Sequence, residues 1–186
     1  IKEAIKFDEM LDENFSLKEK FQHCNIILIA VSKNICRKLT SSLSFNTTVY
    51  GREFQVFDRN RVSINNEKYL IFNSGQKIES YSESKDETKT FSVMFSDDFA
   101  NDALNSMTQP EDYLLDNFGN FKKQPIYFFE KLNPVNDQIQ KVVSRINEAA
   151  DESSDTQSMD EHFQSLITII VNDHRTTSSE INKLPF

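Results

Sequence analysis

The 186-residue sequence is poor in the residues that mark several protein classes: it has no Trp, three Gly, four Pro and two Cys. Cys24 and Cys36 are too few for the disulfide framework of a small secreted protein, and no CxxC pair occurs. The longest apolar run, Ile26 to Val31, is too short to cross a bilayer, and the first residues lack a basic-then-apolar signal pattern. We therefore expect a soluble protein of the cytoplasm.

Positive charge is also scarce. The chain has 21 Lys and Arg against 29 Asp and Glu, which gives a formal net charge of −8. Binding to a phosphate backbone needs a cluster of Lys and Arg. The composition therefore argues against nucleic-acid binding by this segment itself.

Histidine is rare, and His23, His162 and His174 all lie outside the strand-rich part of the chain. A catalytic metal in a β-barrel usually has several His ligands and a carboxylate, often with an HxH pair. The sequence also contains no GxSxG, Walker-type, GxGxxG or HExxH motif. We predict no metal, no other cofactor and no catalytic residues.

What the sequence does have is an alternation of apolar and polar residues from Ser44 to Phe95. Alternate residues share one face of a strand, so this pattern predicts several short strands. Asn, Asp and Gly at 58–61, 65–67 and 73–75 suit the tight turns between them. The spacing predicts an antiparallel meander that closes into a small barrel or sandwich.

The faces predicted to point into the barrel form the candidate ligand site. Small-molecule sites are usually apolar cavities with polar edges, and the guanidinium of Arg52 suits an anionic group. The predicted ligand-binding residues are Arg52, Phe54, Val56, Tyr69, Ile71, Phe91, Val93 and Phe95. The alternative is that these side chains form an ordinary core without a pocket.

The segments beside the barrel give weaker signals. Residues 1–21 suggest a short helix or an irregular arm on the barrel, and residues 25–31 a first strand. Ser96 followed by two Asp predicts a helix from Asp97 that ends before Pro110. Residues 126–129 are compatible with a final strand.

From Asn133 the apolar pattern changes to that of helices. Asn133 as cap and Pro134 in the first turn predict one helix start, and a capping box from Ser158 predicts a second helix that ends near 176–179. A short polar link between two such helices predicts an antiparallel hairpin. We place a domain boundary here, with a barrel and N-terminal arm in residues 1–132 and the hairpin in residues 133–186.

Each predicted helix has an apolar stripe. The residues that we assign to dimerisation are Ile139, Val142, Val143, Ile146, Phe163, Leu166, Ile167 and Ile170. The alternative is that one or both stripes pack only on the barrel.

The order of these segments resembles the N-terminal sensor domain of AraC-type transcription regulators. The resemblance lies in residues 50–54, 58–60, 62–64 and 68–72, followed by Asn73-Ser74-Gly75 where the family commonly has an Asn-Pro-Gly-like turn. The strand at 91–95 and the helix at 96–104 also resemble the family. The similarity spans Ser44 to Lys183.

The resemblance implies an α+β fold: a cupin-like antiparallel β-barrel followed by a C-terminal helical hairpin. It implies a homodimer with a small-molecule effector, no membrane contact, and DNA binding only through a C-terminal helix-turn-helix half that is not in this chain. We therefore expect the regulatory domain of a transcription regulator rather than an enzyme. The alternatives are a ligand-free structural or protein-binding barrel and, less favoured, a metal-free cupin enzyme.

Overall fold

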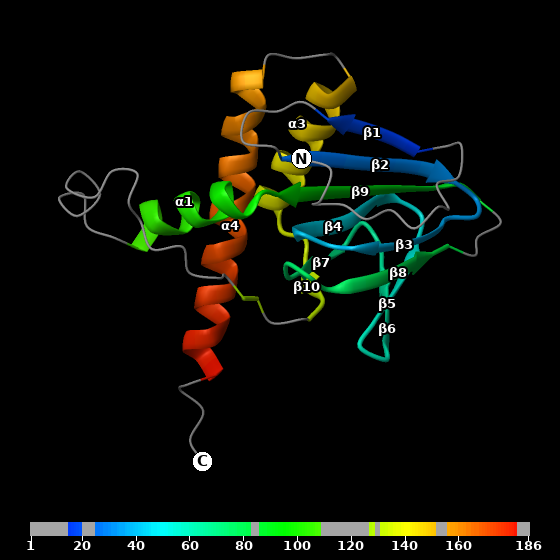
Figure 1. The fold of residues 1–186 in the computed structure, drawn as a ribbon, viewed down its shortest axis with the longest axis horizontal. Coiled ribbons are helices and arrows are strands. Elements are labelled where there is room, and N and C mark those ends of the chain that lie inside the picture. The colour runs from blue at the N-terminus through cyan, green and yellow to red at the C-terminus, as the bar shows by residue number, and fades with distance from the viewer. Residues whose placement is uncertain are drawn as a thin grey trace.

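The structure, a computed structural model, describes residues 15–19, 25–82, 86–108, 127–128, 131–151 and 156–181. These ranges form two antiparallel sheets and three helices (Figure 1). The larger sheet contains, in spatial order, β1 (Phe15–Glu19), β2 (Ile26–Ser32), β9 (Thr88–Phe95), β4 (Leu43–Tyr50), β7 (Lys68–Phe72) and β10 (Asn133–Pro134). The smaller sheet contains β3 (Cys36–Thr40), β8 (Lys77–Tyr81), β5 (Glu53–Phe57) and β6 (Asn60–Ile64). The helices are α1 (Asp97–Thr108), α3 (Asp137–Asp151) and α4 (Thr156–Ile181).

The two sheets face each other and enclose the barrel interior. An apolar cluster with side chains from both sheets lies between them, and its buried members are Leu28, Leu39, Phe57, Ile64, Leu70, Phe72, Ile78 and Met94. The predicted α+β fold, an antiparallel barrel with helices after it, is confirmed.

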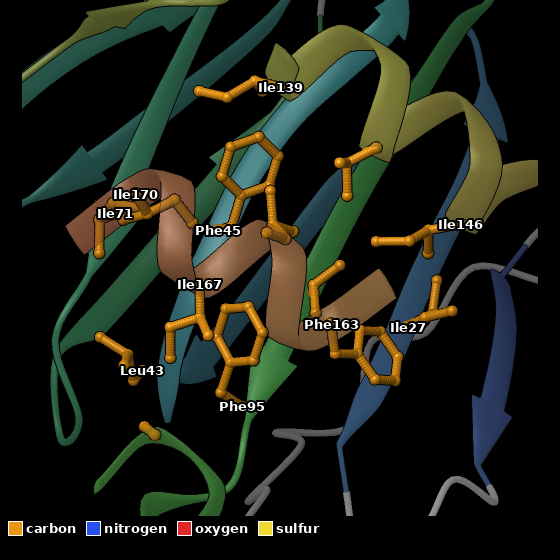
Figure 2. Close-up of a cluster of buried hydrophobic side chains, with 14 of the residues drawn as sticks. Ile27, Leu43, Phe45, Ile71, Phe95, Ile139, Ile146, Phe163, Ile167 and Ile170 are labelled. Atoms are coloured by element: carbon orange, nitrogen blue, oxygen red, sulfur yellow. The ribbon is translucent and has the colours of Figure 1, made fainter. Parts of the chain in front are cut away.

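A second apolar cluster covers the opposite face of the larger sheet. Figure 2 shows Phe45 and Phe95 of the sheet beneath Ile139 and Ile146 of α3 and Phe163 of α4. Burying one such side chain contributes about 1.5–3 kcal/mol. The helical hairpin is therefore fixed to the barrel by a shared core.

The turns behave as their residues predict. Asp58 and Arg59 connect β5 to β6 with φ of 44° and 69°, the positive values that a two-residue hairpin turn requires. Ser96 caps α1, because its Oγ accepts a hydrogen bond from the Phe99 amide at 3.2 Å. The helix ends at Thr108, before Pro110 as predicted.

Several predicted boundaries were wrong. Residues 15–19 form β1 beside β2, not a helix or an irregular arm. Asn133 and Pro134 do not start a helix, because they pair with β7 as β10. The Oδ1 of Asn136 instead accepts the Ile139 amide at 2.9 Å, so the helix is capped three residues later.

The second helix of the hairpin is longer than predicted. It begins at Thr156, before the predicted capping box, and continues through 176–179 to Ile181. Residues 127–128 are not in a strand, and the rest of the predicted strand at 126–129 lies outside the described residues. Cys24 lies outside them too, whereas Cys36 is an exposed free thiol.

Gly51 lies in the turn between β4 and β5, where both the backbone conformation and the nearby Thr88 disfavour a side chain. Its φ is +81°, and an added Cβ would lie 2.5 Å from Thr88 Oγ1 and 2.8 Å from Thr88 Cα. We expect Gly51→Ala to lower the free energy of unfolding by about 2–3 kcal/mol, from backbone strain plus overpacking. Urea denaturation followed by circular dichroism measures this.

Gly75 provides the matched control for that substitution. Its φ is +86°, but nothing lies within 4 Å of the position that a Cβ would take. Gly75→Ala should therefore cost only the backbone strain, about 1–2 kcal/mol. Equal losses for the two variants would show that the contact with Thr88 has no energetic weight.

Candidate functional site

A row of polar side chains crosses the interior face of the smaller sheet. Arg37 on β3 lies directly opposite Ser80 on β8, and Ser80 lies directly opposite Gln55 on β5. Glu53 precedes Gln55 by two residues and therefore shares its face of β5. The sheet register thus brings four polar residues together inside the barrel.

These four residues form a connected network. Arg37 Nη2 donates to Glu53 Oε1 at 2.7 Å, and Gln55 Nε2 donates to Glu53 Oε2 at 2.9 Å. Ser80 Oγ donates to Gln55 Oε1 at 2.8 Å. The exposed fraction is 4% for Arg37 and 1% for Glu53, so the ion pair is fully inside the protein.

The environment of Glu53 has opposing effects on its carboxyl group. Burial raises its pKa above the ordinary value, whereas the Arg37 charge and the hydrogen bonds from Gln55, Arg37 and Ser80 act in the opposite direction. Burial is the largest effect, so the pKa is raised. Both oxygens of the Glu53 carboxylate already accept hydrogen bonds. The network is therefore suited to holding the Glu53 and Arg37 side chains in place rather than to transferring a proton.

The described residues contain no group of three or more His, Cys, Asp or Glu placed to hold a metal ion. Likewise, none of the described helices is both long and apolar enough to cross a membrane.

The residues that the sequence assigns to a ligand site do not point into the barrel. Those of the larger sheet face the helices and belong to the shared core: Tyr69, Ile71, Phe91, Val93 and Phe95. Phe54 and Val56 lie on the outer face of the smaller sheet, and Arg52 is exposed. The predicted orientation of these side chains was therefore wrong. Alternation shows which residues share a face of a strand, but it does not show which face points into the barrel.

Phe54 instead takes part in an aromatic stack on the outer surface. Its ring lies 5.3 Å from that of Tyr81, in a stacked geometry. The guanidinium of Arg61 lies 4.3 Å above the Phe54 ring and 5.1 Å from the Tyr81 ring. This hairpin surface is stabilised by cation–π contacts together with the partial burial of Phe54 and Tyr81.

A second polar cluster lies where the larger sheet meets α4. His174 is buried, with its Nε2 at 3.5 Å from Asn133 Nδ2 and its ring 4.9 Å from the Phe128 ring. The side chain of Asn73 makes two hydrogen bonds to the backbone of Phe128. Its Oδ1 accepts from the Phe128 amide at 2.7 Å, and its Nδ2 donates to the Phe128 carbonyl at 3.0 Å. This cluster joins the end of β7 to the second half of α4.

Burial shifts the pKa of three groups in this cluster: Asp173, Tyr69 and His174. Asp173 receives a hydrogen bond from Asn136 Nδ2 at 3.2 Å and lies beside the Tyr69 hydroxyl. Burial raises the pKa of Asp173, against the hydrogen bonds from Tyr69 and Asn136, and burial together with the Asp173 charge raises the pKa of Tyr69. Burial lowers the pKa of His174, and the charge of Lys131 lowers it further.

We expect His174 to make stability fall on acidification. Its pKa is lower in the folded chain than the ordinary 6.5, so the unfolded chain takes up the proton first as the pH falls through 6.5. Between pH 7 and 5, His174→Gln should therefore lose less stability than the unchanged chain, as measured by urea denaturation at each pH. Asp173, with its raised pKa, acts in the opposite direction and is unchanged in both proteins. Identical pH profiles would contradict this role of His174.

The residues assigned to dimerisation lie mostly in the shared core. Six of them are at most 2% exposed: Ile139, Ile146, Phe163, Leu166, Ile167 and Ile170. Val142 is buried and Val143 is partly buried against the same cluster. Both stripes thus pack on the barrel of their own chain, as in the alternative.

The outward side of the hairpin has a shallow groove between α3 and α4. The hairpin groove is lined by Gln138, Lys141, Val142, Arg145, Gln164, Ser165, Thr168 and Ile169. Lys141 and Arg145 are exposed there, in a chain whose net charge is −8.

Comparison with family models and with curated proteins gives no match. Among solved structures, an apo ToxT variant from Vibrio cholerae strain SCE256 has a similar fold, with a TM-score of 0.54 and 11% identity over 86% of this chain. The fold is cupin-like. This chain spans 58% of the length of that ToxT chain.

Two smaller cupins resemble less of the chain. The cupin domain of an XRE-family transcriptional regulator from Enterobacter cloacae gives a TM-score of 0.39 at 10% identity and covers 45% of this chain and 98% of that one. A cupin superfamily protein from Desulfitobacterium hafniense gives 0.38 at 9% identity, over 47% of this chain and 82% of that one. At these identities the likeness concerns the fold alone.

Proposed function

We propose that this chain is the regulatory domain of an AraC-type transcription regulator, which senses a small-molecule effector and dimerises. The proposal rests chiefly on one observation: the barrel and the helical hairpin share a core, in an arrangement that resembles ToxT over 86% of the chain. The sequence resemblance of residues 44–183 to AraC-type sensor domains supports it. We assign DNA binding to a helix-turn-helix half outside this chain, and to this chain a cytoplasmic location and no catalytic activity.

We further propose that two copies meet through the hairpin groove. The apolar stripes of the helices are used inside each chain, which leaves the outward side of the hairpin for a partner. Lys141 and Arg145 lie on this side, and Glu161 is an exposed acid of the same hairpin. A two-fold dimer brings the same surface to itself, so a surface with both signs of charge can be self-complementary.

A fusion protein tests this function. Residues 1–186 are joined to a DNA-binding domain that represses a reporter only as a dimer, and light scattering gives the mass of the unfused chain. We expect repression well above that of the DNA-binding domain alone, and twice the chain mass of 21.6 kDa. Repression that changes on addition of one compound from a metabolite panel would support effector sensing.

Charge reversal gives the matched control for dimerisation. Lys141→Glu with Arg145→Glu should abolish both repression and the doubled mass. Lys68→Glu with Arg59→Glu makes the same change in net charge at exposed sites on the barrel and should preserve both. A monomeric chain that gives no repression would overturn the proposal.

One observation favours a second candidate, a barrel that dimerises without binding an effector. The apolar cluster between the sheets and the Arg37 network place the chain's own side chains in the interior. Repression by the fusion that no compound alters would favour this candidate.

A further inference from the structure

One edge of the smaller sheet is β6, the second strand of the β5–β6 hairpin. β6 pairs with β5 on one side, and no strand of the described chain pairs with its other side. Figure 1 shows the tip of this hairpin projecting from the barrel, below β8 in that view. Asn60 and Arg61, at the start of β6, are exposed. The β6 edge is therefore accessible to another chain.

The strand register determines which backbone groups point to the β6 edge. Phe57 and Asn60 flank the two-residue turn and therefore exchange both of their backbone hydrogen bonds. Hydrogen-bonded pairs alternate along an antiparallel ladder, so Arg61 and Ser63 direct their N–H and C=O groups away from β5. No backbone group in the described chain hydrogen-bonds to these four groups. They form a short row of donors and acceptors along the β6 edge.

The side chain of Arg61 lies on the outer face beside this edge. Its guanidinium is held 4.3 Å from the centre of the Phe54 ring and 5.1 Å from that of Tyr81. A guanidinium that stacks on rings keeps its N–H groups in its own plane, where a carboxylate can accept two of them. No carboxylate in the described chain forms an ion pair with Arg61, because Glu79, the acid of the same face, pairs with Lys38 at 3.1 Å. Arg61 is thus oriented for a carboxylate from outside the chain.

The outer face of the smaller sheet has an excess of positive charge, in a chain whose net charge is −8. The charged side chains that alternation directs outward are three cations and one acid: Lys38, Lys77, Arg61 and Glu79. Asp58 and Arg59, exposed at the hairpin turn, balance each other. An acidic partner is therefore attracted to this face and repelled by the rest of the chain.

A peptide strand fits the β6 edge better than the other acidic or self-complementary candidates. The phosphate oxygens of a nucleic-acid backbone accept hydrogen bonds but cannot donate to the carbonyl groups of Arg61 and Ser63. A second copy of the hairpin would bring another Asp58, Arg59 and Arg61, which adds positive charge to the edge. Only an extended peptide supplies both backbone donors and backbone acceptors at the spacing of a strand.

We propose that the β6 edge binds an extended acidic segment of a partner protein, which joins the smaller sheet as an antiparallel strand. The backbone of this segment exchanges hydrogen bonds with Arg61 and Ser63. Residues directly opposite each other share a face of the sheet, so an acid opposite Arg61 meets its guanidinium on the outer face. The surface lies on β6, whereas the proposed dimer uses α3 and α4, so this proposal does not depend on the regulatory function.

Titration with the blocked peptide acetyl-Thr-Thr-Val-Glu-Val-Thr-amide, followed by ¹⁵N NMR at pH 7, tests strand addition. We expect saturable shifts, at millimolar peptide, in the amides of residues 59–64 and in the side-chain N–H of Arg61. The same peptide with a methyl group on the glutamate nitrogen cannot donate to the strand there and should give no saturable shift. Equal binding of the methylated peptide would reduce the attraction to charge and overturn strand addition. No saturable shift with either peptide would overturn the site.

A double-mutant cycle tests the contact between Arg61 and the peptide acid. Replacing the glutamate of the peptide by glutamine should weaken binding about two- to fivefold, as expected for an exposed ion pair. Arg61→Gln should weaken binding of the acidic peptide by the same factor and leave binding of the glutamine peptide unchanged. Unchanged binding of the glutamine peptide guards against a loss caused by misfolding. Equal affinity of the two peptides for the unchanged chain would overturn the acidic assignment.

Lys68→Gln is the matched control for Arg61→Gln. It removes the same charge from an exposed position on β7 of the larger sheet and should leave the affinity for the acidic peptide unchanged. If Lys68→Gln weakens binding as much as Arg61→Gln does, the attraction is diffuse and the proposed contact is wrong. Loss of a doubled mass in light scattering on Arg61→Gln would assign the edge to a second copy and overturn the peptide partner.

Discussion

Glu53→Gln is expected to lower the free energy of unfolding by about 3–5 kcal/mol, because it leaves the guanidinium of Arg37 inside the barrel without its carboxylate. The neutral amide can still accept hydrogen bonds, but it cannot balance a charge that is 4% exposed. Urea denaturation at pH 7, followed by circular dichroism, gives the free energies.

A neighbouring ion pair of the smaller sheet, between β3 and β8, provides the control. Lys38 Nζ lies 3.1 Å from Glu79 Oε1, but these side chains are 63% and 44% exposed and point out of the barrel. Glu79→Gln should therefore cost at most about 1 kcal/mol. If Glu53→Gln costs no more than Glu79→Gln, the buried pair is not strongly coupled.

Removing both buried charges distinguishes a structural role from a binding role. Arg37→Met with Glu53→Leu leaves no charge inside the barrel, so most of the stability lost in Glu53→Gln should return. If effector sensing by the fusion protein disappears in this stable double variant, the pair also contributes to the effector site.

The fold was largely predictable because local rules agree with it. Alternation placed the strands, and the Asp58 turn and the Ser96 cap were each set by a short sequence with one clear preference. The start of α3 was misplaced because Asn133 and Asn136 are both acceptable caps, and pairing with β7 selects the second. That choice depends on tertiary contacts that no local pattern contains.

The buried network was not predictable by the same rules. Glu53 and Gln55 alternate with Phe54 and Val56, and this pattern usually places the charged face in water. Here the polar face is enclosed because Arg37 lies across the sheet to balance Glu53. Arg37 lies 16 residues before Glu53, on β3, and only the strand register across β8 brings the pair together.

Phe91→Ala and Phe54→Ala test this difference between the two faces directly. The sequence assigned both rings to one ligand cavity, but Phe91 is 0% exposed between the larger sheet and the helices. Its removal should cost about 3–5 kcal/mol, from lost burial and the cavity left behind. Phe54 lies in the outer stack with Tyr81 and Arg61, so its removal should cost about 1 kcal/mol.

The same urea denaturation measures both variants, and the ratio of the two losses is the informative quantity. A buried ring leaves a cavity that the shared core cannot close, whereas water fills the space that an outer ring leaves. Similar losses for Phe91→Ala and Phe54→Ala would mean that both faces are buried alike, as the sequence alone suggested. A several-fold larger loss for Phe91→Ala would show that the attachment of the helices, not a ligand cavity, determines the conformation of this ring.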